Sequence, residues 1–146
     1  MAASDGKRFR LAFLTVLLLL LTAAGWYLRG LMRLGYIDSA IASVRTLVDE
    51  EKRFAGMHPD RGYACAISEL DGRRLPERLG NTGYRNGYIF DLTCPATDPL
   101  AVRRSFQVTA RPVQSGLPAY CSDQSGVLRT AEGGSTEECL KRGSPL

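Results

Sequence analysis

The chain has 146 residues, four cysteines, one histidine and a formal net charge of +4 at neutral pH. This length leaves room for one membrane segment and one small domain of about 110 residues. The basic residues are not interleaved with aromatic residues and form no nucleic-acid-binding motif, so we predict a solvated surface and exclude a nucleic-acid partner.

The first element in chain order is an uncharged apolar run at residues 11–28. A helix of this length rises about 27 Å, which nearly matches the hydrocarbon core of a bilayer at about 30 Å. Its leucines favour insertion, and the aromatic residues near its end are typical of a membrane interface. We therefore predict a transmembrane helix with anchoring side chains at Leu11, Leu14, Leu17, Leu18, Leu21, Trp26 and Leu28.

Basic residues flank the apolar run, three before it and two after it: Lys7, Arg8, Arg10, Arg29 and Arg33. This bias predicts a cytoplasmic N-terminus over residues 1–10 and an extracytoplasmic location for the chain beyond the run. The alternative is a cleaved secretory signal peptide, because small residues precede Gly25. The length of the apolar run favours an uncleaved anchor, since the core of a signal peptide spans about 7 to 15 residues.

Residues 29–57 continue the helix with a different pattern. Apolar side chains recur at spacings of three and four, which is typical of an amphipathic helix. One acidic residue falls on this stripe, whose members are Ile37, Ile41, Val44, Leu47, Val48, Glu51 and Phe54. Gly56 and Pro59 end the pattern. We expect one helix from about residue 11 to residue 57, apolar all round in its first half and striped in its second.

Residues 58–146 are predicted to form a small β-rich domain. Residues 62–70 should form a single helical turn before the turn pair Asp71-Gly72. Residues 73–86 contain a proline, two glycines and several arginines, which indicates a surface loop.

Alternating apolar residues predict two paired strands after this loop. The first strand covers residues 87–94, and one of its faces should pack on the helix stripe. The second strand covers residues 105–110, and Pro112 prevents it from continuing. The inward side chains are Tyr88, Phe90, Leu92 and Cys94 in the first strand and Phe106, Val108 and Ala110 in the second.

A short hairpin is predicted next, with strands at residues 119–123 and 127–129 around a turn at residues 123–126. The glycine at the end of this turn favours the positive φ that the turn requires. The tail beyond the hairpin has a loop-like composition, and we expect Cys139 to hold it in place.

All four cysteines lie beyond the apolar run, at Cys65, Cys94, Cys121 and Cys139. Small extracytoplasmic domains commonly use disulfides to supplement a modest core, so we predict two disulfides here. Sequence alone leaves three pairings open. Zinc is the rival ligand, but the chain has no C-x-x-C pair and no histidine near a cysteine.

No catalytic constellation is recognisable. His58 follows the predicted helix and is interpreted as structural, while Asp123 and Ser125 belong to a turn that favours such residues without any base beside them. The neighbouring acids Glu50 and Glu51 point to different faces of a helix, so they form no carboxylate dyad. We predict no enzymatic activity, no cofactor, no metal and no small-molecule substrate.

The predicted fold is α+β, with a long N-terminal helix, transmembrane and then amphipathic, packed on a small antiparallel sheet closed by disulfides. This architecture resembles the type IV pilins and the type II secretion pseudopilins. The segments that carry the resemblance are SVRTLVDEEKRF at residues 43–54, GYACAISEL at 62–70, NGYIFDLTC at 86–94, FQVTARPVQSG at 106–116 and YCSDQSGVLR at 120–129.

Together with the order of the cysteines, the resemblance favours pairing Cys65 with Cys94 and Cys121 with Cys139. It implies a single-pass protein of the bacterial inner membrane with a periplasmic C-terminal domain. It further implies a minor pilin or pseudopilin role in a type IV pilus or type II secretion system, in which the chain assembles with other envelope proteins or with copies of itself.

The N-terminal part departs from the family pattern. Gly6 is followed by Lys7 rather than by the phenylalanine of a prepilin leader, and no acidic residue lies between Asp5 and Asp38. In that family a glutamate in the apolar helix neutralises the N-terminal amine of a neighbouring subunit, where an unpaired charge is costly. We therefore expect a pilin-like domain on an ordinary anchor. The alternative is a small secreted or anchored binding module outside any filament.

Overall fold

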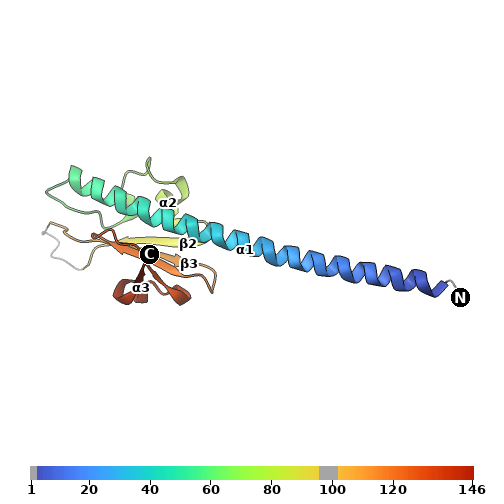
Figure 1. Ribbon diagram of the computed structural model, residues 1–146. Coiled ribbons are helices and arrows are strands. Elements are labelled where there is room, and N and C mark those ends of the chain that lie inside the picture. The colour runs from blue at the N-terminus through green and yellow to red at the C-terminus, as the bar shows by residue number, and fades with distance from the viewer. Residues whose placement is uncertain (1–2, 96–101) are drawn as a thin grey trace. The chain divides into compact units, whose positions relative to one another are not determined.

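The computed structural model describes residues 3–95 and 102–146. The chain divides into two compact units, Met1–Gly35 and Tyr36–Leu146. One helix, α1 (Ala3–Met57), forms the described part of the first unit and continues as the first element of the second (Figure 1). Its end at Met57 is as predicted. It starts before residue 11 because the lysine and arginines ahead of the apolar run are good helix formers.

The second unit contains one antiparallel sheet of six strands, whose order in space is their order in the chain. The α+β fold class is therefore confirmed. Both edge strands are only two residues long. The strands are β1 (Tyr84–Arg85), β2 (Tyr88–Thr93), β3 (Gln107–Pro112), β4 (Ala119–Asp123), β5 (Arg129–Ala131) and β6 (Ser144–Pro145).

The neighbouring strands β2 and β3 confirm the predicted alternation and pairing. Their register aligns Phe90 with Ala110 and Leu92 with Val108. All four side chains are buried, whereas the side chains that alternate with them on β2 are exposed. One face of the sheet is therefore apolar, as the period of two in the sequence indicated.

The predicted hairpin is present as β4 and β5, with its second strand shifted. β5 begins at Arg129 rather than at Val127. The turn extends further than predicted because the Gly126 amide donates to the Asp123 carbonyl at 2.8 Å and the Ser122 hydroxyl donates to the Val127 carbonyl at 3.0 Å. These two hydrogen bonds hold Val127 in the turn and out of the ladder.

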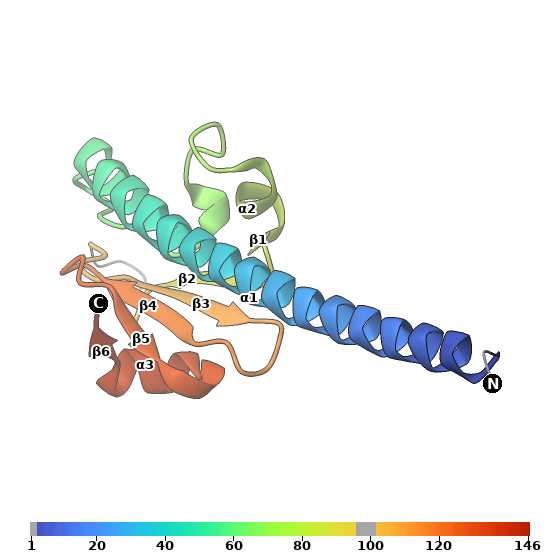
Figure 2. The same ribbon diagram turned by 45° about the vertical axis from the view of Figure 1, so that its right-hand side comes forward.

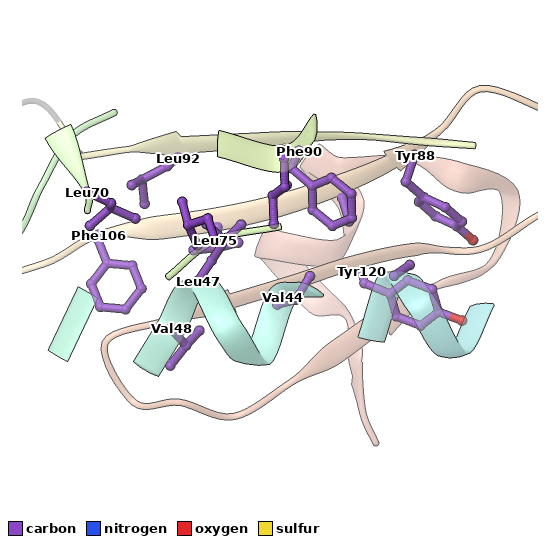
Figure 3. Close-up of a cluster of buried hydrophobic side chains, with 14 of the residues drawn as sticks. Val44, Leu47, Val48, Leu70, Leu75, Tyr88, Phe90, Leu92, Phe106 and Tyr120 are labelled. Atoms are coloured by element: carbon purple, nitrogen blue, oxygen red, sulfur yellow. The ribbon is translucent and has the colours of Figure 1, made fainter. Parts of the chain in front are cut away.

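The hydrophobic core lies between the second half of α1 and the apolar face of the sheet (Figure 3). Five of the seven predicted stripe residues are buried, and Ile37 and Ile41 are partly buried against the same core. Ala40 and Ser43 widen the contact, because small side chains let the helix approach the sheet closely. The buried stripe residues are Val44, Leu47, Val48, Glu51 and Phe54.

The segment between α1 and the sheet is more ordered than predicted. The expected helical turn is η1 (Ile67–Glu69), but the surface loop predicted over residues 73–86 is wrong. This stretch contains α2 (Glu77–Thr82) and β1, and Leu79 is buried in the core together with Leu75, which is labelled in Figure 3. Pro76 starts α2 and Gly83, in the left-handed region at φ 65°, ends it. A helix of six residues is too short to show a repeating apolar pattern. The glycines and arginines of residues 73–86 therefore led to the prediction of a loop.

The prediction that the C-terminal tail is loop-like is also wrong. It contains η2 (Glu132–Gly134), α3 (Thr136–Arg142) and β6, and α3 covers the face of the sheet opposite α1 (Figure 2). The Ser135 hydroxyl caps α3 by accepting a hydrogen bond from the Glu138 amide at 3.2 Å. Acidic residues in its first turn and basic residues in its last complement the helix dipole. Cys139, a residue of α3, is buried beside Ala131.

The burial of α2 generates a stability prediction. Leu79→Ala should lower the free energy of unfolding by about 2–5 kcal/mol, because the Leu79 side chain is 0% exposed and its removal leaves a cavity. Chemical denaturation of the full chain in detergent micelles measures the change. Arg78→Ala, at the exposed neighbouring position, is the matched control and should change the stability by less than about 0.5 kcal/mol. Equal effects of the two variants would contradict the packing of α2.

Candidate functional site

The first unit is a helix whose apolar side chains face its surroundings. The predicted anchor residues Leu14, Leu17, Leu18, Leu21, Trp26 and Leu28 are all exposed, with Trp26 at 79%. The Leu11 side chain lies outside the described residues. In the described part of the chain, α1 is the one helix long and apolar enough to cross a membrane. An exposed apolar surface of this extent is typical of a segment that contacts lipid or protein.

The polar groups of this segment are few, and Thr22 illustrates how they are satisfied. Its hydroxyl donates to the Leu19 carbonyl at 2.8 Å within the same helix. A hydroxyl paired within its own helix avoids the cost of an unsatisfied donor in a medium without water. The apolar run therefore fits a bilayer in composition and in hydrogen bonding.

The second unit carries both disulfides, Cys65–Cys94 and Cys121–Cys139. These are the pairings favoured from the sequence. The first joins the segment before η1 to the end of β2, and the second joins β4 to α3. No group of three or more metal-ligating side chains occurs among the residues that the structure describes. Because disulfides persist in oxidising compartments, this pair indicates an extracytoplasmic domain.

A buried carboxyl at Glu51 is the group in the second unit that sequence reasoning missed. Its side chain lies on α1 and is 0% exposed. Oε2 accepts a hydrogen bond from the Ala64 amide at 3.0 Å, while Oε1 has no hydrogen-bond partner among the described residues. An acidic residue on an apolar helix stripe was the available signal, and the prediction used it only to exclude a dyad with Glu50.

An ion-pair network lies next to this carboxyl. The Glu69 carboxylate accepts hydrogen bonds from Arg103 at 2.8 Å and from Arg61 at 3.1 Å. The same carboxylate accepts a hydrogen bond from the Cys65 amide at 3.3 Å. The ion pair that Arg103 forms is with Glu69 rather than with Glu51. The network ties together the end of α1, the first disulfide and the chain that enters β3.

Burial raises the pKa of the Glu51 carboxyl from 4.5 to about 7. The hydrogen bond from Ala64 lowers this pKa, the nearby Glu69 carboxylate raises it and Arg103 lowers it, but the loss of solvation is the largest effect. Glu51 therefore changes its charge near neutral pH. Neighbouring Glu50 points elsewhere and pairs with Arg53 at 2.8 Å, as predicted for adjacent acids on a helix.

The remaining candidate residues have structural contacts. The Nδ1 atom of His58 lies 3.0 Å from the Phe54 carbonyl oxygen, and the two rings stack with centroids 4.3 Å apart. The Asp123 carboxylate accepts hydrogen bonds from the Ser125 amide at 2.8 Å and from Arg129 at 2.9 Å. Burial raises the pKa of Asp123, but the hydrogen bonds from Ser125 and Arg129 outweigh it and hold the pKa below its ordinary value. These contacts belong to a helix end and a hairpin turn.

No model of a known protein family matches the chain, and neither curated proteins nor solved structures give a significant match. The resemblance to pilin-like proteins therefore stays a prediction. The distinctive features of this chain are the apolar helix, the two disulfides and the buried carboxyl network.

The disulfides generate a prediction about the stability of the second unit. Replacing both Cys121 and Cys139 by serine should lower the free energy of unfolding by about 3 kcal/mol, and replacing both Cys65 and Cys94 should lower it by about 3–4 kcal/mol, because the first disulfide closes the longer loop. Denaturation under non-reducing conditions measures both variants. A reductant should destabilise the unmodified protein and leave the four-serine variant unchanged. No difference between oxidised and reduced protein would contradict the prediction.

The raised pKa of Glu51 predicts that the protein is more stable in acid than in mild alkali. The native state binds the proton of the Glu51 carboxyl more tightly than the unfolded state does. The stabilisation from this protonation is complete below pH 4.5 and is lost as the pH rises through about 7. The full change is about 3 kcal/mol. Denaturation at pH 5 and pH 8 should show a loss in the unmodified protein that Glu51→Gln abolishes. Asp49→Asn, at an exposed position on α1, should retain it.

Proposed function

We propose that the chain is a non-enzymatic, single-pass protein of the bacterial inner membrane, with its N-terminus in the cytoplasm and its second unit in the periplasm. In this proposal the second unit is a pilin-like domain that assembles with other envelope proteins of a pilus or secretion system. The observation that carries the proposal is the continuity of α1. A helix that is exposed and apolar over residues 13–28 is the same helix whose later turns form the core of a disulfide-closed sheet domain.

The exposed surface of the first unit supports a role in assembly. Apolar side chains are exposed over residues 13–28. An apolar surface of this extent is typical of a segment that contacts lipid or another protein.

The sheet edges indicate which surfaces a partner would use. β1 and β6 are each two residues long, and β6 contains Pro145, which has no amide hydrogen to donate. Adding a strand at either edge is therefore unfavourable. Partners would instead contact the apolar surface of α1, because helices in a membrane associate by van der Waals packing.

The N-terminal sequence argues for assembly with other proteins over a filament of identical copies. The apolar run contains no acidic residue, so it cannot neutralise the amine of a neighbouring subunit within the bilayer. Heterologous partners do not require that pair. The second candidate, an anchored or secreted binding module outside any filament, is favoured by the same observation.

Crosslinking in native membranes tests the proposal. Cysteines introduced one at a time at every position from Leu14 to Leu21 should form crosslinks to another chain, and the yield should follow the helical period because one face of the helix is in contact. Gel electrophoresis without reductant and mass spectrometry identify the linked chains. Monomer alone at every position would contradict assembly.

Two controls separate the candidate functions. A cysteine at the exposed position Thr93, outside the apolar run, reports random collision and should give a low yield. N-terminal sequencing of the membrane protein reports processing. A start at Met1 or Ala2 supports the uncleaved anchor, whereas a start at Gly25 supports the secreted module.

A further inference from the structure

Residues 61–65, called the latch segment here, connect the end of α1 to the first disulfide. Three sets of contacts hold this segment in place. The Tyr63 amide donates to the Arg103 carbonyl at 3.0 Å, and the Arg103 amide donates to the Arg61 carbonyl at 3.0 Å. Cys65 is fixed by its disulfide to Cys94. Between these two anchors, the Ala64 amide donates to the Glu51 carboxyl on α1.

The segment passes very close to the chain that enters β3. Gly62 has φ +80°, and a Cβ atom at this position would overlap the Arg103 carbonyl oxygen. The two stretches form a parallel bridge at Gly62 and Arg103. The bridge, the disulfide and the Glu69 network thus join the latch segment to the sheet side of the domain, and Glu51 joins it to the buried face of α1.

We infer that Glu51 is a proton-dependent latch, which holds residues 61–65 against α1 while the carboxyl is protonated and releases them when it ionises. The geometry gives the reason. An ionised carboxylate needs several hydrogen bonds, but in the closed arrangement Oε2 has one and Oε1 has none among the described residues. Opening of the latch segment lets water reach Oε1, so ionisation and opening favour each other.

The charged groups around Glu51 do not relieve this cost. From η1, the Glu69 carboxylate repels an ionised Glu51. From the chain entering β3, Arg103 attracts it, but this guanidinium already binds Glu69. On the latch segment, Arg61 also binds Glu69 and lies over the Phe54 ring at 5.6 Å. These contacts leave the charge of Glu51 to be solvated by water.

Two polar side chains near Glu51 in sequence, Glu50 and His58, make their contacts with other residues. The Glu50 carboxylate next to Glu51 pairs with Arg53. His58, the residue after α1, stacks on Phe54. Its Nδ1 atom lies 3.0 Å from the Phe54 carbonyl oxygen rather than against Glu51. A variant at His58 therefore serves as one of the controls.

Amide hydrogen exchange of the full chain in detergent micelles between pH 5 and pH 8 tests the latch. After correction for intrinsic exchange, the protection factor of the Ala64 amide should fall about tenfold per pH unit between pH 5 and 7 and then level off, by at most about 300-fold. It should also be lower than the protection factors of amides in the central strand β3, because the latch segment opens without global unfolding. Glu51→Gln, which cannot ionise, should abolish the pH dependence at Ala64.

The control variants are Asp49→Asn, which removes an exposed carboxylate from the same helix, and His58→Gln. Both should retain the pH dependence of the unmodified protein. Protection at Ala64 that is independent of pH would overturn the latch. So would the same protection at Ala64 and in β3 at every pH, because exchange would then report only global unfolding. Loss of the pH dependence in His58→Gln would assign it to the histidine and overturn the role of Glu51.

Discussion

The contact on which the second unit depends is the packing of α1 against the apolar face of the sheet. The helix supplies Val44, Leu47 and Val48, and β2 and β3 supply the facing side chains. A small sheet with one open face would be unstable in water, because a domain of this size buries too little surface without a covering layer. α1 provides that layer on one side and α3 provides a smaller one on the other. The disulfides then fix the parts of the chain that contribute least to this core, the segment before η1 and the tail.

The periodic elements were predictable because each carries its own repeating signal. The stripe of α1 predicted burial of Val44 and Phe54, and the period of two predicted the buried face of β2. The C-terminal end of α1 followed from Gly56 and Pro59. The cysteine pairing was favoured by order and by resemblance, and the structure contains both bonds.

The short elements could not be predicted in the same way. α2 and α3 have only six and seven residues, so neither shows an apolar period, and their positions depend on Leu79 and Cys139 reaching the core. The role of Glu51 was hidden for a related reason. Its environment is made by Ala64, Glu69 and Arg103, which are distant in sequence and meet only in the folded domain. An acid on an apolar stripe is a sequence signal, but its partners are set by tertiary structure.

In the proposed membrane location, the short edge strands have a consequence for how closely copies of the domain can pack. Proteins confined to a surface meet one another at a local concentration far above that of the same number of molecules in solution, and exposed strand edges are then templates for aggregation. β1 and β6 offer only two residues each, and β6 includes a proline. The domain can therefore be crowded side by side without its sheets merging into a continuous ribbon.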